Sequence, residues 1–118
     1  MKLVFALVPT LLFATAAAGQ EVAPESAKDL WCGIAFGVMT ASAPADATAE
    51  QQVLIQQYTD GGTMLIDRAK TAHLASGFTE ASFATHVETL TAEVTTQVQT
   101  AGAAATYSFE ECSALIAP

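Results

Sequence analysis

Positive charge is scarce in this chain of 118 residues, which has four lysine and arginine side chains against twelve aspartate and glutamate side chains. The formal net charge at pH 7 is −8. Nucleic acids and anionic membrane surfaces are bound through clusters of lysine and arginine. The composition therefore argues against both as partners and predicts an acidic protein.

Asparagine is absent altogether, so the chain offers no acceptor for N-linked glycosylation. Long apolar runs are also missing after residue 19. The longest is the ten-residue stretch 30–39, whereas a helix that spans a bilayer needs about 20 apolar residues. We therefore expect no membrane association of the mature form.

The chain also lacks the usual motifs of catalysis, such as a phosphate-binding loop or a nucleophile elbow. His73 and His86 are its two histidines, and neither has a metal-ligating residue three or four positions later. We predict no enzyme activity, no cofactor and no metal site, and interpret both histidines as ordinary helix-surface residues. A ligand or general-base role for a histidine, or a nucleophilic pair of Cys32 with His86, stays open as the alternative.

The N-terminal residues 1–19 have the three regions of a secretory signal peptide. Lys2 supplies the positive charge, an apolar run follows, and small residues precede the expected cleavage after Ala18 or Gly19. An uncleaved membrane anchor is the alternative. Cleavage would leave residues 20–118, which we expect to form a single helical domain, secreted and located in a bacterial periplasm.

The first helix is predicted over residues 27–40. Ser26 would cap its N-terminus, and Asp29 three positions later completes a capping pattern. A loop that contains Pro44 follows, because proline cannot continue a helix.

The second helix is predicted to begin near Asp46 or Thr48 and to end near Ser76, with Gly77 as its C-cap. Gly61 and Gly62 in its interior are a turn signal that would divide it in two. The apolar residues keep a single face only if one helix continues through the glycines, which favours one long helix. That face comprises Leu54, Tyr58, Leu65, Ala69 and Ala72.

A third helix is predicted from the N-cap Thr79 to Gly102, and a short fourth helix follows a capping box formed by Ser108 and Glu111. The third helix has an apolar stripe with helical spacing, made up of Phe83, Val87, Leu90, Val94 and Val98. A strand over residues 90–98 is the alternative, because apolar and polar residues alternate there. Together these patterns predict an all-α fold, a small bundle of three longer helices plus a short C-terminal helix.

The uncharged stretch 30–39 is the expected centre of the fold, because a helix that is apolar nearly all round is a buried helix. Gly33 and Gly37 lie one turn apart and predict close approach of a neighbouring helix. Cys32 in this stretch and Cys112 near the C-terminus are the two cysteines. In an exported protein they are expected to form a disulfide that closes the bundle; two free buried thiols are the alternative.

The segment 25–32, with sequence ESAKDLWC, resembles the stretch before the first cysteine in small periplasmic acid-stress chaperones of the HdeA and HdeB type. Members of that family are helical, exported and closed by one disulfide. The resemblance covers eight residues, and the second cysteine here lies 80 positions further on, much later than in that family. No functional residue is carried over from it.

We predict a non-enzymatic binding or interaction module, with an unknown protein or a small apolar ligand as its partner. Its apolar binding face is expected around Trp31, Phe36 and Tyr58. A conditional chaperone of the acid-stress type is the alternative, because acid would neutralise the carboxylates and could loosen the bundle. An enzyme is the third and least favoured possibility.

Overall fold

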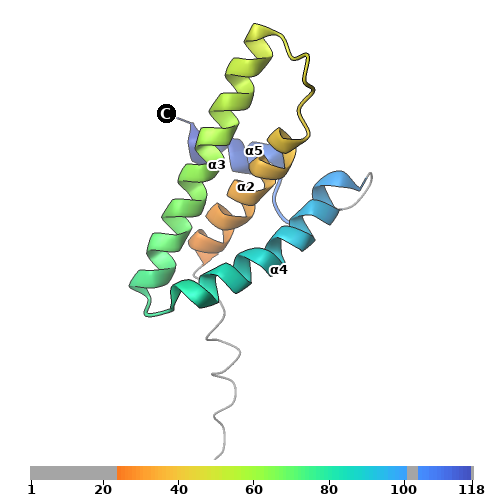
Figure 1. Ribbon diagram of the computed structural model, residues 1–118. Helices are drawn as coiled ribbons and strands as arrows, with labels where there is room; N and C mark the ends of the chain where they lie inside the picture. The colour runs from red at the N-terminus through yellow and green to blue at the C-terminus, as the bar shows by residue number, and fades with distance from the viewer. Residues whose placement is uncertain (1–23, 101–103, 118) are drawn as a thin grey trace, which may run out of the picture.

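The computed structural model describes residues 24–100 and 104–117, which form four helices and no strand. In the labels of Figure 1 the helices are α2 (Pro24–Ala41), α3 (Ala49–Ala75), α4 (Glu80–Gln99) and α5 (Phe109–Ile116). The predicted all-α fold with three longer helices and a short C-terminal helix is confirmed. The predicted signal peptide (1–19), the first residues of the predicted domain (20–23) and Gly102 lie outside the described residues.

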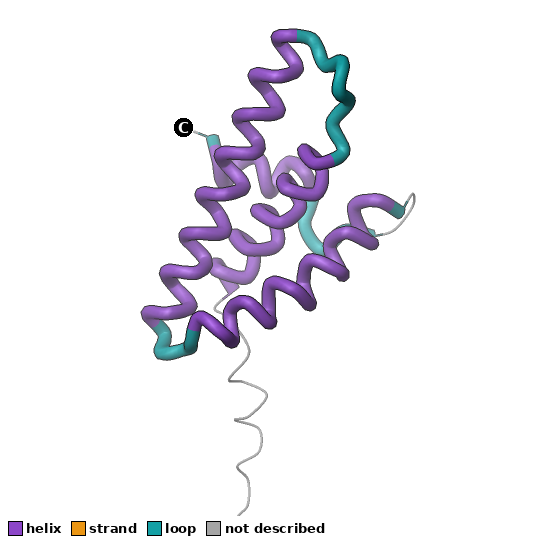
Figure 2. The backbone as a smooth tube through the Cα atoms, viewed as in Figure 1, coloured by secondary structure: helices purple, strands orange, loops and turns teal. Residues whose placement is uncertain are grey.

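Helix α2 lies at the centre of the bundle and contacts each of the other three helices. Helix α3 runs beside it in the opposite direction, α4 crosses the pair on one side, and α5 lies on the other side (Figure 1). Short loops connect α2 to α3 and α3 to α4 (Figure 2). No helix in the described ranges is both long enough and apolar enough to cross a membrane.

The core is built mainly from the uncharged stretch of α2. Its contribution consists of the buried residues Leu30, Trp31, Cys32, Ile34, Ala35 and Phe36. The other helices add Leu65 and Ala69 from α3, Phe83 and Val94 from α4, and Cys112 from α5. The prediction of a buried central helix is therefore confirmed over residues 30–36. It is wrong for the last turn of α2, where Met39 is 40 % exposed.

Cys32 and Cys112 form a disulfide with Cα atoms 5.2 Å apart, so the predicted closure of the bundle is confirmed. Both residues are buried. The bond ties α5 to the middle of α2 across a sequence separation of 80 residues.

Helices α2 and α3 approach most closely at two glycines. A Cβ atom on Gly33 would lie 2.8 Å from the carbonyl oxygen of Gly62, and one on Gly62 would lie 3.0 Å from that of Gly33. The predicted close approach is confirmed at Gly33 but is wrong at Gly37, where an added Cβ would meet nothing within 4 Å. Helix α3 continues through its glycine pair as one helix, as the apolar phase predicted. Gly62 of this pair lies at the contact with α2.

The predicted N-caps Thr79 of α4 and Ser108 of α5 are confirmed, whereas the C-cap of α3 is Ser76, one residue before the predicted Gly77. Thr48 and Gln51 form a capping box at the start of α3, Thr79 caps α4, and Ser108 forms a second capping box with Glu111. Gly77 follows α3 with φ of 95°, a left-handed conformation that favours glycine. The side-chain oxygens of Thr48, Thr79 and Ser108 accept hydrogen bonds from backbone N–H groups that have no partner inside the helix.

Two details of the prediction are wrong. Helix α2 begins at Pro24, so Ser26 lies inside its first turn and is buried instead of capping the helix. Leu54 is 52 % exposed, although the apolar phase of α3 placed it on the packed face. The reason is length: α3 has 27 residues against 18 in α2, so its first turns extend beyond the end of α2 (Figure 1).

Three ion pairs occur within the described ranges, and each joins two helices. Lys28 of α2 reaches Glu111 of α5 at 3.6 Å, Asp29 of α2 binds Arg68 of α3 at 2.8 Å, and Lys70 of α3 reaches Glu80 of α4 at 2.9 Å. The Asp29–Arg68 pair is bidentate, and Asp29 is only 8 % exposed. These pairs are therefore tertiary contacts, whereas the sequence suggested only a local role for Asp29.

Candidate functional site

A cavity of about 370 Å³ opens beside the disulfide, between α2, the end of α4, the connector before α5, and α5 itself. We call it the Trp31 cavity. None of its lining residues carries a charge. They are Trp31, Ala35, Phe36, Met39, Gln97, Val98, Ala105, Tyr107, Phe109 and Cys112. The surface lining the cavity is mostly apolar, as is usual for sites that bind small molecules.

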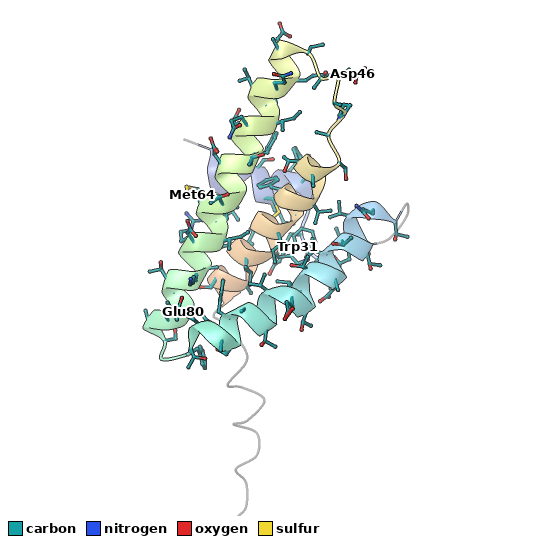
Figure 3. The ribbon with its side chains drawn as sticks, in the orientation of Figure 1. Trp31, Asp46, Met64 and Glu80 are labelled. Carbon is teal, nitrogen blue, oxygen red and sulfur yellow. A yellow bond between two sulfur atoms is a disulfide. The ribbon has the colours of Figure 1, made fainter. Side chains whose placement is uncertain are left out.

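Aromatic rings form the walls of the Trp31 cavity. The ring centroids of Trp31 and Tyr107 are 5.6 Å apart in an edge-to-face arrangement, and Phe36 and Phe109 meet edge-to-face at 6.2 Å. Trp31 lies in the interior between α2 and α4 (Figure 3), and its indole Nε1–H has no hydrogen-bond acceptor among the described residues. Phe109 and Met39, at 49 % and 40 % exposed, place apolar surface at the solvent boundary of the cavity.

The structure brings together two of the three residues predicted to form an apolar binding face. Trp31 and Phe36 both line the cavity, whereas Tyr58 does not. Tyr58 lies behind the wall, with its ring centroid 5.1 Å from that of Phe36 and 5.6 Å from that of Phe109. It supports the cavity wall through α3, so a direct contact of Tyr58 with a ligand is not part of this geometry.

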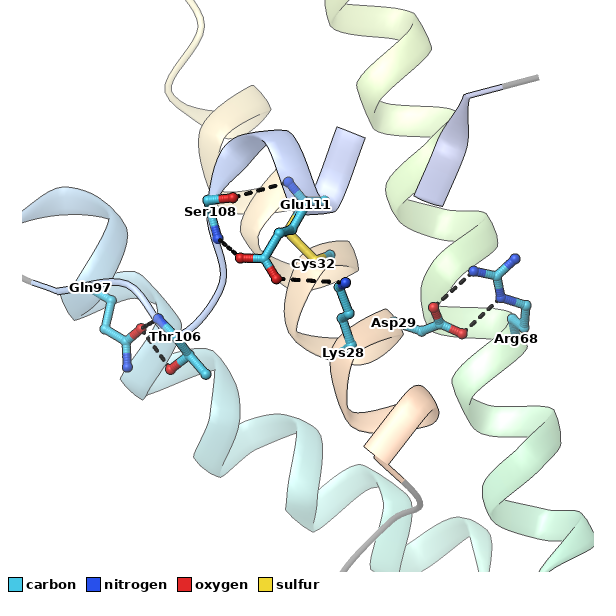
Figure 4. The surroundings of a disulfide bond; sticks show 9 residues. Lys28, Asp29, Cys32, Arg68, Gln97, Thr106, Ser108 and Glu111 are labelled. Carbon is cyan, nitrogen blue, oxygen red and sulfur yellow. Dashed lines mark hydrogen bonds and ion pairs between the residues drawn. A yellow bond between two sulfur atoms is a disulfide. The ribbon is translucent and has the colours of Figure 1, made fainter. Parts of the chain in front are cut away.

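The connector before α5 is held in place by polar contacts (Figure 4). The side-chain oxygen of Gln97 accepts hydrogen bonds from the backbone N–H and the hydroxyl of Thr106, at 2.8 and 3.1 Å. Glu111 accepts a hydrogen bond from the backbone N–H of Ser108 and pairs with Lys28. The Ser108 backbone N–H, the Ser108 hydroxyl and Lys28 together lower the pKa of Glu111 below its usual value. The carboxylate therefore stays charged to a lower pH than an ordinary glutamate.

A second hollow, of about 480 Å³, surrounds the Asp29–Arg68 ion pair. Lys28 also lines it, but all three charged side chains are already paired within the protein. The Trp31 cavity is the better candidate site, because its walls are apolar, whereas the charged groups of the second hollow are already paired within the protein.

His73 is not a surface residue, which corrects the prediction for it. It is 2 % exposed, and its ring packs 4.7 Å from Phe78 and 5.3 Å from Phe83 between centroids. The Ser82 hydroxyl donates a hydrogen bond to the Thr79 carbonyl, so its oxygen accepts one from the Nε2–H of His73 at 2.9 Å. Nδ1 is then an unprotonated atom, buried without a partner among the described residues.

Burial, and secondarily the nearby His86, lower the pKa of His73 below 6.5. The folded protein therefore disfavours the protonated form. The stability that neutral His73 contributes is complete above about pH 6.5, the ordinary pKa, and is lost as the pH falls toward the lowered pKa of the folded state. We therefore expect the urea concentration at the unfolding midpoint to decrease as the pH is lowered through this range.

The His73→Gln variant should lose this pH dependence, because its side-chain amide still donates to Ser82 and does not titrate. The matched His86→Gln variant leaves His73 buried and should retain most of the dependence. Urea titrations from pH 7 to 5 compare the three proteins. If the unfolding midpoints of the wild type and His73→Gln change equally with pH, His73 does not control the pH dependence of stability in this range.

One of the catalytic alternatives raised by the sequence, the nucleophilic pair of Cys32 with His86, is excluded by the disulfide. Cys32 is joined to Cys112, so it is not a thiol nucleophile for His86. The described part of the chain holds no cluster of three or more histidine, cysteine, aspartate or glutamate side chains placed to bind a metal ion.

Several cavity residues were missed by sequence reasoning. Phe109 had one signal, since it is an aromatic residue in the otherwise polar first turn of α5, directly after the Ser108 cap. Val98 was predicted only as part of the packed stripe of its helix. Gln97 and Ala105 carried no signal at all, because their role depends on how the connector folds back onto α4.

Comparisons of the chain with protein-family models, with curated proteins and with solved structures find no match.

Proposed function

We propose that the protein is a non-enzymatic binding module that takes an apolar group into the Trp31 cavity. The observation that carries the proposal is a cavity of about 370 Å³ with uncharged, largely aromatic walls. That volume falls in the lower range of small-molecule sites, which span roughly 300–1,000 Å³. It suits an apolar amino-acid side chain or a small aromatic compound.

The disulfide and the capped connector support this proposal, because they hold the cavity walls in place before a ligand arrives. Cys112 in the wall is bonded to Cys32, and Gln97 fixes the connector through Thr106. A preformed site loses less conformational entropy on binding than a mobile one.

The test is a substitution that fills the cavity from the connector. Ala105 lines the cavity and is exposed, so Ala105→Phe should place a ring in the space without disturbing the buried core. We expect binding of the neutral fluorescent probe N-phenyl-1-naphthylamine to weaken by roughly tenfold or more, about 1.4 kcal/mol. Truncation of Trp31 is a poorer test, because this buried residue also supports the fold.

The matched control is Ala104→Phe, which adds the same ring at an exposed neighbouring position outside the cavity lining. It should bind the probe as the wild type does. Equal affinity of all three proteins, or no saturable binding to the wild type, would reject the cavity as a binding site.

The proposal includes export to an oxidising compartment, a bacterial periplasm. It is supported by the signal-peptide pattern of residues 1–19 and by the disulfide, a bond that is rare in reducing compartments. We expect the intact mass of the protein purified from a periplasmic fraction to correspond to a chain that begins at Gly19 or Gln20. The mass should be lower by two hydrogen atoms because the two cysteines form a disulfide. A mass that includes Met1 would contradict export with cleavage.

A conditional chaperone is the second candidate function, favoured by the placement of the ion pairs. Each of the three described pairs joins two helices and depends on a carboxylate, Asp29, Glu80 or Glu111. Acid would remove all three, and protonation of buried His73 would add to the loss. A loosened bundle would expose its apolar core.

This second function predicts that the protein prevents aggregation of an acid-unfolded enzyme at about pH 3 and binds a hydrophobic dye there. At pH 7 the protein should not prevent aggregation and should bind less of the dye than at about pH 3. A protein that stays fully folded and binds no dye at about pH 3 would eliminate the chaperone function.

A further inference from the structure

The cations in the described part of the chain are all engaged within the fold. Lys28, Arg68 and Lys70 are its three lysine and arginine residues, and each pairs with a carboxylate of another helix. Lys28 is the one that lies near the Trp31 cavity, with its Nζ 5.8 Å from the centre of the Tyr107 ring, but it is bound to Glu111. A ligand that carries a negative charge would therefore find no unpaired cation there.

Most of the carboxylates, in contrast, have no cationic partner among the described side chains. Seven of the carboxylates whose side chains the structure describes form no ion pair: Asp46, Glu50, Asp60, Asp67, Glu88, Glu93 and Glu110. Two of them are connected to residues that line the cavity, one by a hydrogen bond and one by position in the sequence. Glu93 accepts a hydrogen bond from the amide of the lining residue Gln97 at 3.3 Å, and the exposed Glu110 directly follows the lining residue Phe109. The surroundings of this uncharged cavity thus carry unbalanced negative charge.

We propose that the partner of the Trp31 cavity is a basic amphipathic peptide segment, which inserts an apolar side chain into the cavity and places lysine or arginine near Glu93 and Glu110. This inference rests on the proposed function. Charge complementarity of this kind favours the correct partner and speeds its encounter. Like charge disfavours an acidic ligand of the same shape.

The test uses three short peptides that share a central phenylalanine and differ only in the residues flanking it, which are lysine, glutamine or glutamate. The peptides contain no tryptophan, so the fluorescence of Trp31, the single tryptophan of the protein, reports binding. We expect the lysine peptide to bind roughly fivefold more tightly than the glutamine peptide, and the glutamate peptide to bind most weakly. The difference in affinity between the three peptides should decrease in 0.5 M salt, at which exposed charges are screened beyond roughly 4 Å.

Two double variants locate the charges responsible. Glu93→Gln with Glu110→Gln should remove most of the preference for the lysine peptide over the glutamine peptide. Asp46→Asn with Asp67→Asn is the matched control, because it changes the net charge equally at positions outside the cavity lining. Asp46 lies in the loop at the far end of α3 from Glu80 (Figure 3). The control should retain the preference.

The outcomes separate the inference from the function on which it rests. If the lysine and glutamine peptides bind equally well, the cavity binds apolar groups but the basic partner is wrong. If the control double variant loses the preference as fully as the cavity variant, overall charge explains it and the role of Glu93 and Glu110 is wrong. If no peptide binds and the neutral probe does not bind either, the proposed function itself fails.

Discussion

Replacing both Cys32 and Cys112 with alanine is expected to lower the free energy of unfolding by about 4 kcal/mol, because the bond restricts an unfolded chain across 80 residues. Domains of this size have a total stability of only about 5–15 kcal/mol. The variant should therefore unfold at a much lower urea concentration than the wild type. The measurement is a pair of urea titrations followed by circular dichroism.

Wild-type protein in reductant is the control for the double variant, since it loses the bond and keeps the side chains. Its unfolding midpoint should fall close to that of the variant. Helix α5 has only eight residues, too few to be stable alone, so it should lose protection from hydrogen exchange first. An unchanged midpoint in both cases would show that the disulfide is not what closes the bundle.

Alanine substitutions at Gly33 and Gly37 are expected to change stability in opposite directions. At Gly33 the new Cβ would lie 2.7 Å from Ile66 Cγ1 and 2.8 Å from the Gly62 carbonyl oxygen, so the two helices would have to separate. We expect a loss of about 2 kcal/mol there, the usual cost of overpacking a core. At Gly37 the space is open, and alanine should gain about 0.5–1 kcal/mol through its higher helix propensity.

The Gly37→Ala variant thus serves as the matched control for Gly33→Ala, in the same helix and one turn away. Thermal unfolding of the two variants and the wild type gives the comparison. Equal stabilities of the two variants would contradict the close crossing of α2 and α3. A stabilising effect at both positions would show that the helices lie further apart than the structure places them.

The helices and most of their starts could be predicted because their signals are local. Capping residues such as Thr79 and Ser108 act on backbone groups within three positions, and the apolar stripe of α4 follows the helical period. The continuity of α3 through Gly61 and Gly62 was also predictable, since its apolar phase is kept across the pair. The disulfide was predicted from an even count of two cysteines in a chain whose N-terminal pattern predicts export.

Other features depended on contacts between distant residues, for which a single sequence has no signal. Asp29 at the start of α2 completes a local capping pattern, yet it pairs with Arg68 in α3, 39 residues later. His73 follows the buried Ala69 by four positions. It is buried by contacts with Ser82 and Phe83 of α4, which the turn at Gly77 folds back over it. Gly37 has the same spacing signal as Gly33 but no helix opposite it.

The candidate site was predictable only in part. Trp31 and Phe36 stood out because they are large aromatic residues in an uncharged helix, and both line the cavity. The opposite wall comes from Val98, Tyr107 and Phe109, which the fold brings to α2 through the disulfide and the Gln97–Thr106 contact. Those residues lie more than 60 positions away in the sequence, so spacing alone could not assign them to one site.

The most direct test of the binding site is the single indole N–H signal of Trp31 in a proton–nitrogen correlation spectrum. This N–H has no acceptor among the described residues, and its ring forms a wall of the cavity. On titration with the phenylalanine-centred lysine peptide, we expect a saturable shift of this signal, together with shifts of the backbone signals of Phe36, Ala105 and Phe109. An indole signal that stays in place while the peptide binds elsewhere, or does not bind at all, would contradict this expectation.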